Sequence, residues 1–473
     1  MGTKKGIFSV LRKSAAVVMA VFCFAGSAAA QSETLADALA NAYRTSGLLD
    51  QNRALLRAAD EDVAGAVALL KPILDYTASI IRDEGKRNTG PISTSLDLTT
   101  FQAGLQASLL LYDGGASRFN IESLKETVLA TRQSLISAEQ QVLLRAVAAF
   151  LSVRTARDLV ALRVNNVNLL AQELRAAEDR FEVGEVTRTD VAQAESRLAD
   201  ARSNLATAQG DLLQANAEYV AVVGNEPGNL AKPPSLPQLE SNIEVARTRA
   251  LQVHPDVQSA QHQVSAAELN ILQARARIQP TISAVGSLTA QEDLNSGDDL
   301  RIGSFGLELR GPIYQGGGID SLIRRAIAVR DAQRGNLIVV TRRISQDVSN
   351  SYAELSSRRA SLSSSDERIR AARIAFEGVR EEATLGARTT LDVLDAEQEL
   401  LDAETRRLLD EANLYVAAYA VLQSTGRLTA RDLRLGVELY DPVAYYNLAK
   451  DAPTEMSKQG QQLDRVLKSL QRE

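Results

Sequence analysis

A period of two runs through four short segments of this chain, in which apolar residues alternate with small or polar ones. Side chains of a β-strand point alternately to its two faces, so each segment is expected to form a strand with one apolar face. Polar stretches at 85–95 and 291–299 are predicted to be the loops of two hairpins. The predicted strands lie at about 73–82, 98–112, 281–290 and 302–314.

Between the strands the pattern changes to that of long helices. Residues 116–182 contain neither proline nor glycine. At ~1.5 Å per residue this predicts one helix on the order of 100 Å long. Apolar residues recur every seven positions along it, which is typical of a coiled-coil stripe; they are Ile121, Val128, Leu135 and Val142. Further helices are expected over about 33–71, 187–223, 241–279 and 319–384, and from after a turn at Gly386 to about 424.

This order of elements occurs twice. Gly184 and Gly386, which end the two longest predicted helices, are separated by 386 − 184 = 202 residues. Tyr112 and Tyr314 end the two hairpins at the same offset, 314 − 112 = 202. A constant offset between matching landmarks indicates a duplication.

The repeats define the domain organisation that the sequence predicts. We expect a first repeat at 31–224, a proline-containing linker at 225–240, a second repeat at 241–427 and a C-terminal segment at 428–473. The last part of that segment, after about 452, is polar and is expected to be loosely ordered.

The N-terminus is predicted to be an export signal covering residues 1–30. Basic residues precede an apolar core at 14–24, and Ala28, Ala29 and Ala30 fit the small-residue cleavage rule. Beyond it, no stretch approaches ~18 consecutive apolar residues, so no transmembrane helix is expected. The single cysteine, Cys23, lies within the signal, so disulfides and thiolate metal sites are not expected in the mature chain.

Composition narrows the function classes. The net charge of −6 argues against a surface that binds nucleic acid. The two histidines, His254 and His262, are expected to be surface residues, because no third metal ligand stands at a suitable spacing. No nucleophile, base and orienting group form a recognisable set, so we expect no enzymatic activity, catalytic residue, metal or cofactor.

The strand count has a consequence for the membrane. Four strands cannot close a barrel, and open strand edges are not tolerated in lipid. A membrane-spanning form must therefore be an oligomer, with eight strands in a dimer or twelve in a trimer. The residue pattern alone does not choose between them.

Several motifs together resemble the TolC family of outer-membrane efflux and type I secretion channels, over about 33–447. Beyond the duplication, they are Pro280 before the second hairpin, Pro312-Ile313-Tyr314-Gln315-Gly316-Gly317 after it, Val183-Gly184 with Thr189-Asp190, Gly386 followed by Asp392-Val393-Leu394-Asp395, and the tail at 436–451. The resemblance implies a mainly α protein with a small β part. It also implies a homotrimer with a 12-stranded outer-membrane barrel, continued by a helical tunnel across the periplasm of a Gram-negative bacterium.

The resemblance further implies partners and site residues. The partners would be a periplasmic adaptor, an inner-membrane transporter and outer-membrane lipid. The helix–turn–helix corners would dock the adaptor through Val183, Gly184, Thr189, Asp190, Leu385 and Gly386. Asp392 and Asp395 would ring the constricted periplasmic entrance, with Arg388 tying neighbouring helices together. A tyrosine that some members carry just before the second corner is replaced by Ala383, which puts that part of the closed state in question.

The residues themselves leave simpler interpretations open. Three positions apart on a helix, Asp392 and Asp395 share a face, yet Asp392 could merely cap the N-terminal turn. Arg388 lies one turn earlier and could pair with Asp392 in the same chain or a neighbouring one. Thr189 and Asp190 could equally be an ordinary N-cap pair. Glu308 and Arg310 fall on the polar strand face, where they would face the barrel lumen or be simply solvated.

Two other function classes compete with a channel. One is an exported coiled-coil scaffold or adaptor without a membrane barrel, and the other is an exported hydrolase. Four alternating strands in duplicated positions favour the channel, because a scaffold in water has no use for four strands with apolar faces.

Overall fold

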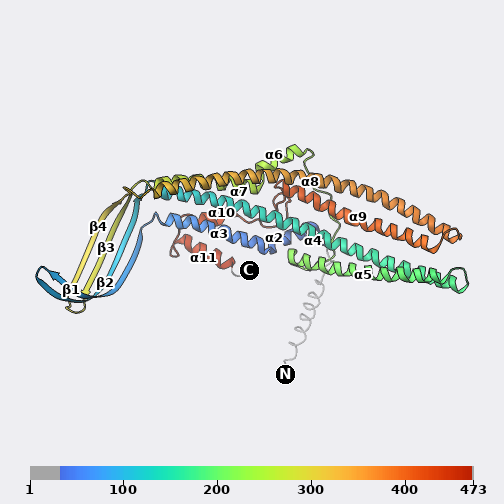
Figure 1. The fold of residues 1–473 in the computed structure, drawn as a ribbon, viewed down its shortest axis with the longest axis horizontal. Coiled ribbons are helices and arrows are strands. Elements are labelled where there is room, and N and C mark those ends of the chain that lie inside the picture. The colour runs from blue at the N-terminus through green and yellow to red at the C-terminus, as the bar shows by residue number, and fades with distance from the viewer. Residues whose placement is uncertain (1–31, 471–473) are drawn as a thin grey trace, which may run out of the picture. The chain divides into compact units, whose positions relative to one another are not determined.

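The computed structural model describes residues 32–470, and the predicted signal at 1–30 lies outside them. The described chain is mostly helical, with one small sheet (Figure 1). The first repeat comprises α2 (Leu35–Thr45), α3 (Gly47–Ala68), β1 (Ile73–Thr89), β2 (Ile92–Tyr112), α4 (Ala116–Glu182) and α5 (Arg188–Val223). The second comprises α6 (Ile243–Val253), α7 (Pro255–Ala276), β3 (Thr281–Asp293), β4 (Asp299–Arg310), α8 (Gly318–Thr384) and α9 (Thr390–Ser424). The expected mainly α fold with a duplicated repeat is confirmed.

The two hairpins join into one antiparallel sheet with the order β1-β2-β3-β4 (Figure 1). The central pairing runs from Thr100 opposite Asp293 to Tyr112 opposite Ile282. Strands β1 and β4 are therefore the edges of the sheet. Paired residues on neighbouring strands share a face, so the alternation in the sequence gives the sheet one apolar and one polar side.

The strands differ in length from the sequence prediction. The predicted loop at 85–95 belongs largely to the β1–β2 ladder, which continues to Thr89 opposite Ile92. Ladder bonds join backbone groups, so polar side chains do not end a strand, and the turn falls at Gly90 with φ +65°. Strand β4 ends at Arg310 because Gly311 and Pro312 follow, and proline has no N–H for the ladder.

Helix α4 has the range that the absence of proline and glycine predicts. Its seven-residue stripe is buried. Within residues 32–470, α4 alone contains an 18-residue window long and apolar enough to cross a membrane, and 56% of that window is buried inside the protein. Such burial is typical of the core helix of a helical bundle.

Two helices that the sequence predicted as continuous are each broken in two. Ser46 separates α2 from α3 and accepts a hydrogen bond from the Leu49 backbone N–H as the N-cap of α3. His254 separates α6 from α7 in an extended conformation, because Pro255 disfavours a helical residue before it. The breaks correspond in the duplication, since 254 − 46 = 208 and 280 − 72 = 208.

The C-terminal segment is more ordered than predicted. It forms α10 (Pro442–Ala449) and α11 (Lys458–Leu470), so the polar tail is a helix over most of its length. The Tyr445 hydroxyl donates a hydrogen bond of 2.7 Å to Glu61 Oε1, which attaches α10 to α3.

The described residues form two compact units that cut across the repeats. One unit takes 32–45, 145–237 and 358–416, and includes both helix–turn–helix corners. The other takes 46–144, 238–357 and 417–470, and includes the whole sheet.

Candidate gate and docking corners

The two helix–turn–helix corners have the same backbone. Gly184 and Gly386 follow α4 and α8 with φ of +78° and +76°, a conformation that strains any residue with a side chain. The residue after each glycine donates to a carbonyl five positions back, from Glu185 to Arg180 at 2.9 Å and from Ala387 to Glu382 at 2.9 Å. This glycine motif satisfies the free carbonyls of the ending helix and turns the chain sharply.

Each following helix begins with a threonine–aspartate capping box. Thr187 caps α5, and the Asp190 carboxylate accepts hydrogen bonds from the Thr187 backbone N–H and hydroxyl, both at 2.8 Å. Asp392 accepts from Thr389 in the same way, at 2.9 and 2.8 Å. In each case these bonds, from the backbone N–H first and the hydroxyl second, hold the pKa of the aspartate below its ordinary value. The simpler interpretation of both aspartates, as capping residues, therefore has a direct structural basis, but the N-cap of α5 is Thr187 and not Thr189.

Arg388 does not pair with Asp392. Its Nε lies 2.8 Å from Glu382 Oε2, so it closes the second corner back onto the end of α8. The equivalent position in the first corner is Val186, which has no charge to offer. The two corners thus share a backbone and differ in their ion pairs.

Asp395 is ion-paired. Arg197 Nη2 lies 2.6 Å from Asp395 Oδ1, which joins α5 of the first repeat to α9 of the second. Both side chains are partly exposed, at 37% for Arg197 and 56% for Asp395. Local sequence pattern could not predict this pair, because the two residues are 198 positions apart.

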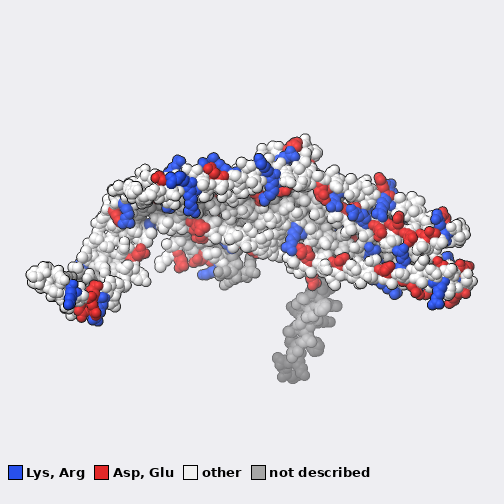
Figure 2. Space-filling model, viewed as in Figure 1, with Lys and Arg blue, Asp and Glu red and all other residues white. Residues whose placement is uncertain are grey.

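The tips of the corners expose matching apolar side chains. Val183 and Leu385 are 71% and 83% exposed, and they occupy equivalent positions because 385 − 183 = 202. Thr189 is also exposed. Around these tips, the ends of α4, α5, α8 and α9 that meet at the corners carry charges of both signs (Figure 2). An exposed apolar residue between charged flanks is what a protein docking site offers.

The sheet exposes large apolar side chains on one face. They come from both edge strands and include Leu74, Tyr76, Phe305, Leu307 and Leu309, each at least 68% exposed. Acidic and basic residues of the sheet gather toward the hairpin ends, and the middle is almost uncharged (Figure 2). Such a band suits contact with lipid.

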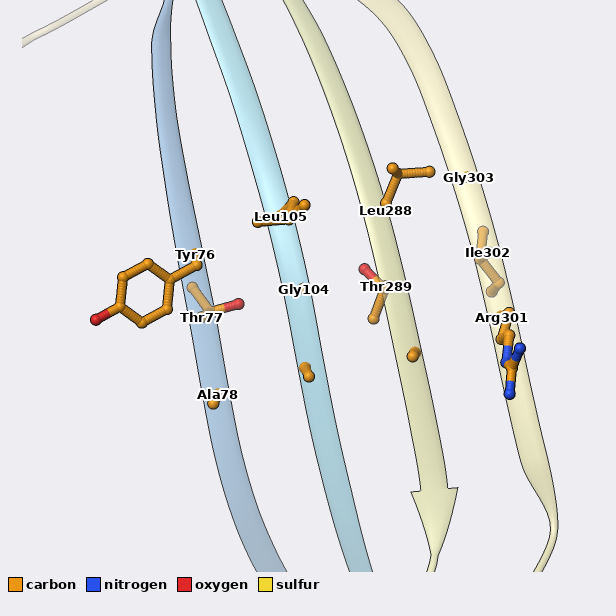
Figure 3. A pocket seen from close by; sticks show the side chains of 12 residues that line it. Tyr76, Thr77, Ala78, Gly104, Leu105, Leu288, Thr289, Arg301, Ile302 and Gly303 are labelled. Carbon is orange, nitrogen blue, oxygen red and sulfur yellow. The ribbon is translucent and has the colours of Figure 1, made fainter. Parts of the chain in front are cut away.

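The opposite face of the sheet is small and polar. Thr77, Gly104 and Thr289 lie side by side on β1, β2 and β3 (Figure 3). A side chain on Gly104 would come within 3.2 Å of the Thr77 hydroxyl, so the three strands pack closely here. Further along this face, Arg310 Nη2 lies 2.6 Å from Glu308 Oε1, so these two residues form an ion pair.

One of the two histidines differs from the sequence prediction. His254 is not a surface residue: it is 5% exposed, and its ring caps α7 by accepting from the Asp256 backbone N–H at 3.2 Å. His262 Nδ1 lies 2.7 Å from Glu126 Oε2. Among residues 32–470 no cluster of three or more histidine, cysteine, aspartate or glutamate side chains is arranged to hold a metal ion.

Sequence reasoning missed a buried contact behind the second corner. Asn166 Nδ2 on α4 donates a hydrogen bond of 2.7 Å to Glu397 Oε1 on α9. Glu397 is only 5% exposed. A glutamate on a helix is ordinarily exposed, as Glu195 is at the equivalent position of the first repeat. The sequence pattern therefore did not indicate that Glu397 is buried.

Comparisons with known proteins agree with this architecture. The outer membrane efflux protein family matches residues 28–225 and 246–427. Outer membrane efflux protein BepC of Brucella suis is 35% identical over 441 residues, which cover 93% of this chain and 95% of that protein. Outer membrane protein TolC of Escherichia coli is 23% identical over 91% of this chain and 90% of its own length.

Solved structures show the same fold. The CmeC outer membrane channel of Campylobacter jejuni superposes with a TM-score of 0.74 at 16% identity, covering 89% of this chain and 90% of that one. CusC superposes with a TM-score of 0.73 at 20% identity, covering 84% and 92%. Together with the duplicated repeat and the two-faced sheet, these matches show that the chain belongs to the outer membrane efflux protein family and is a TolC-type channel protein of the outer membrane.

Proposed function

We propose that three copies of this chain form one exit duct through the outer membrane. The observation that carries this is the four-stranded sheet, whose edges β1 and β4 have no partner strand within the described part of one chain. Open edges in lipid are too costly to persist, because each unpaired backbone group loses its hydrogen bond with water. Pairing β4 of one copy with β1 of the next would close twelve strands around the small, polar face.

The helices would continue this duct through the periplasm. Helix α4 alone has 67 residues, which at ~1.5 Å each is about 100 Å. The corners at Gly184 and Gly386 would form the inner end of the duct. They would dock a periplasmic adaptor through Val183 and Leu385. An inner-membrane transporter would deliver cargo through that adaptor. The tripartite arrangement is supported by family membership and by the paired exposed apolar tips.

Asp392 and Asp395 are proposed to form the gate at that end. Three copies would bring six carboxylates around one axis, which attracts cations and repels anions. The capping box keeps Asp392 ionised, and the pair with Arg197 fixes the place of Asp395. Arg388 would stabilise the closed corner through Glu382. Glu308 and Arg310 would face the lumen of the barrel. A transport role of this kind requires neither catalysis nor a cofactor.

Extraction and sizing test this proposal. The mature chain should fractionate with outer membranes, require detergent for release and elute at the mass of a trimer. Recovery as a water-soluble periplasmic monomer would instead support the exported scaffold. The exposed apolar band of the sheet argues against that alternative, because a monomer in water would gain nothing by exposing it.

A further inference from the structure

The contact between Asn166 and Glu397 lies at a junction of both repeats. Next to it, Leu170 of α4, Leu198 and Ala201 of α5, and Leu394 of α9 form one buried apolar cluster. Glu397 lies two residues beyond Asp395 on α9, so the cluster and the hydrogen bond hold the first turns of α9 immediately behind the second corner. Loss of this contact would free the helix that carries both gate carboxylates.

Glu397 is an unusual residue to bury there. One carboxylate oxygen accepts from Asn166, and the other, Oε2, is buried without any hydrogen-bond partner. A buried polar atom without a partner costs free energy, and an ionised one costs more. In the protonated acid only a neutral hydroxyl lacks a partner, whereas in the carboxylate a full negative charge is buried. Burial therefore favours the protonated form of Glu397.

The surroundings do not neutralise that charge. Glu173 of α4 adds negative potential and Arg380 of α8 opposes it. A cavity of about 440 Å³ adjoins Glu397, and α5 lines it with Arg197 and Asp200. On α9, Asp395 already pairs with Arg197. The cavity is large enough to admit water or a turned side chain.

These groups set the protonation of Glu397. Together they raise its pKa to about 7; burial is the largest influence, and the charge of Glu173 acts in the same direction. The hydrogen bond from Asn166 and the charge of Arg380 act in the opposite direction. Asp392 does not titrate in this range, because its capping bonds keep its pKa below the ordinary value.

We propose that the Asn166–Glu397 hydrogen bond is a proton-sensitive latch that holds α9 against α4 and so positions the gate carboxylates. The packed arrangement binds the proton more tightly than an open one, in which Glu397 would have its ordinary pKa of about 4.5. The packed arrangement therefore loses stability as pH rises from about 4.5 to about 7. Above about pH 7 its stability no longer depends on Glu397 protonation. Between pH 5 and pH 8 the equilibrium should shift toward opening by on the order of tenfold or more.

The inference rests on the proposed gate, and its test reads helix packing rather than conductance. Beyond Cys23 of the predicted signal the chain has no cysteine, so single cysteines can be introduced cleanly. Ala201→Cys would place a thiol in the buried cluster, and Ser203→Cys would place an exposed one two residues away on the same helix. The rate of reaction with dithiodipyridine is measured at each cysteine, and the readout is the rate at residue 201 divided by the rate at residue 203. This ratio cancels the intrinsic pH dependence of thiol reactivity.

In the full mature chain in detergent, the ratio should rise at least fivefold from pH 5 to pH 8. With Glu397→Gln, whose amide oxygen can still accept from Asn166, it should stay flat. Glu195→Gln makes the same change at the equivalent exposed position and should leave the rise intact. Asn166→Ala removes the donor and should raise the ratio at both pH values.

A flat ratio with Glu397 present, or a rise that survives Glu397→Gln, would overturn the latch. A chain that shows the expected ratio yet forms no trimer or pore would contradict the proposed function alone. A conducting trimer with a flat ratio would contradict the latch alone.

Discussion

Arg197 on α5 and Asp395 on α9 form an ion pair with 2.6 Å between Nη2 and Oδ1. The pair changes the picture of the two acids at the second corner. Asp392 is held by its own helix N-terminus, and Asp395 is held by a helix of the other repeat. The proposed gate therefore consists of two carboxylates with different partners, not of two equivalent free charges.

Replacing Arg197 with glutamine should strengthen cation binding at the gate. Asp395 would keep its charge and lose its partner, so half-maximal block of the pore by a divalent cation should need roughly two- to tenfold less cation. The free energy of unfolding should fall by less than about 1 kcal/mol, because the pair is partly exposed. Bilayer recordings and thermal melts measure the two effects. Weaker block in Arg197→Gln would show that Asp395 does not act on the ion path.

Gly386→Ala should destabilise the second corner by about 1–2 kcal/mol, because φ is +76° there. Gly184→Ala should cost a similar amount at the first corner. Gly378→Ala is the matched control: it lies inside α8 with no neighbour within 4 Å of a new Cβ, and should stabilise the helix by about 0.5–1 kcal/mol. Chemical denaturation of the three variants gives the order directly. Equal stability of Gly386→Ala and Gly378→Ala would contradict the assigned backbone.

Thr389→Ala removes the hydroxyl of the capping box and should cost about 1 kcal/mol of helix stability. Thr187→Ala makes the equivalent change at the first corner and should cost about the same. Hydrogen exchange at the first turns of α5 and α9 would measure both. If only one variant increased exchange in its own helix, the equivalence of the two capping boxes would be wrong.

Asp60 on α3 should make stability depend on pH. Its carboxylate is fully buried, and neither oxygen has a hydrogen-bond partner. Burial first, and Glu61 to a lesser degree, raise its pKa to about 6 against the opposing charge of Arg132. The folded state therefore binds this proton more tightly, and stability falls as pH rises from about 3.8 to about 6.

Asp60→Asn should raise the free energy of unfolding by about 1–3 kcal/mol at pH 7.5 and by little at pH 4. Melting temperatures at the two pH values provide the measurement. Asp62→Asn changes an exposed neighbour and should have almost no effect at either pH. A loss of stability in Asp60→Asn at pH 7.5 would show that the aspartate is held as a charge.

Local pattern was sufficient for much of the fold. Continuous helical periodicity without proline or glycine predicted the range of α4, and alternation predicted the two faces of the sheet. Polar residues at the hairpin ends misled the prediction, because backbone hydrogen bonds carry β1 on to Thr89. The breaks at Ser46 and His254 were missed for a different reason: a cap or a following proline interrupts a helix without disturbing its apolar stripe.

The candidate site was harder to predict because it depends on contacts between the repeats. The capping role of Asp392 is local, and the spacing from Thr389 could reveal it. The partners of Asp395 and Glu397 lie on other helices, 198 and 231 positions away. Arg388 was expected to act toward Asp392 or a neighbouring helix, and it pairs with Glu382 because the glycine turn brings the end of α8 back beside it.

Cation block in planar bilayers tests the central claim most directly. Purified trimer should insert as long-lived pores, and a divalent cation added on the side of the helical end should block them. Asp392→Asn combined with Asp395→Asn should weaken that block at least tenfold. Asp190→Asn changes the equivalent aspartate of the first corner and should leave the block nearly unchanged. Unaltered block in the double variant, or equal weakening by Asp190→Asn, would contradict a gate at the second corner.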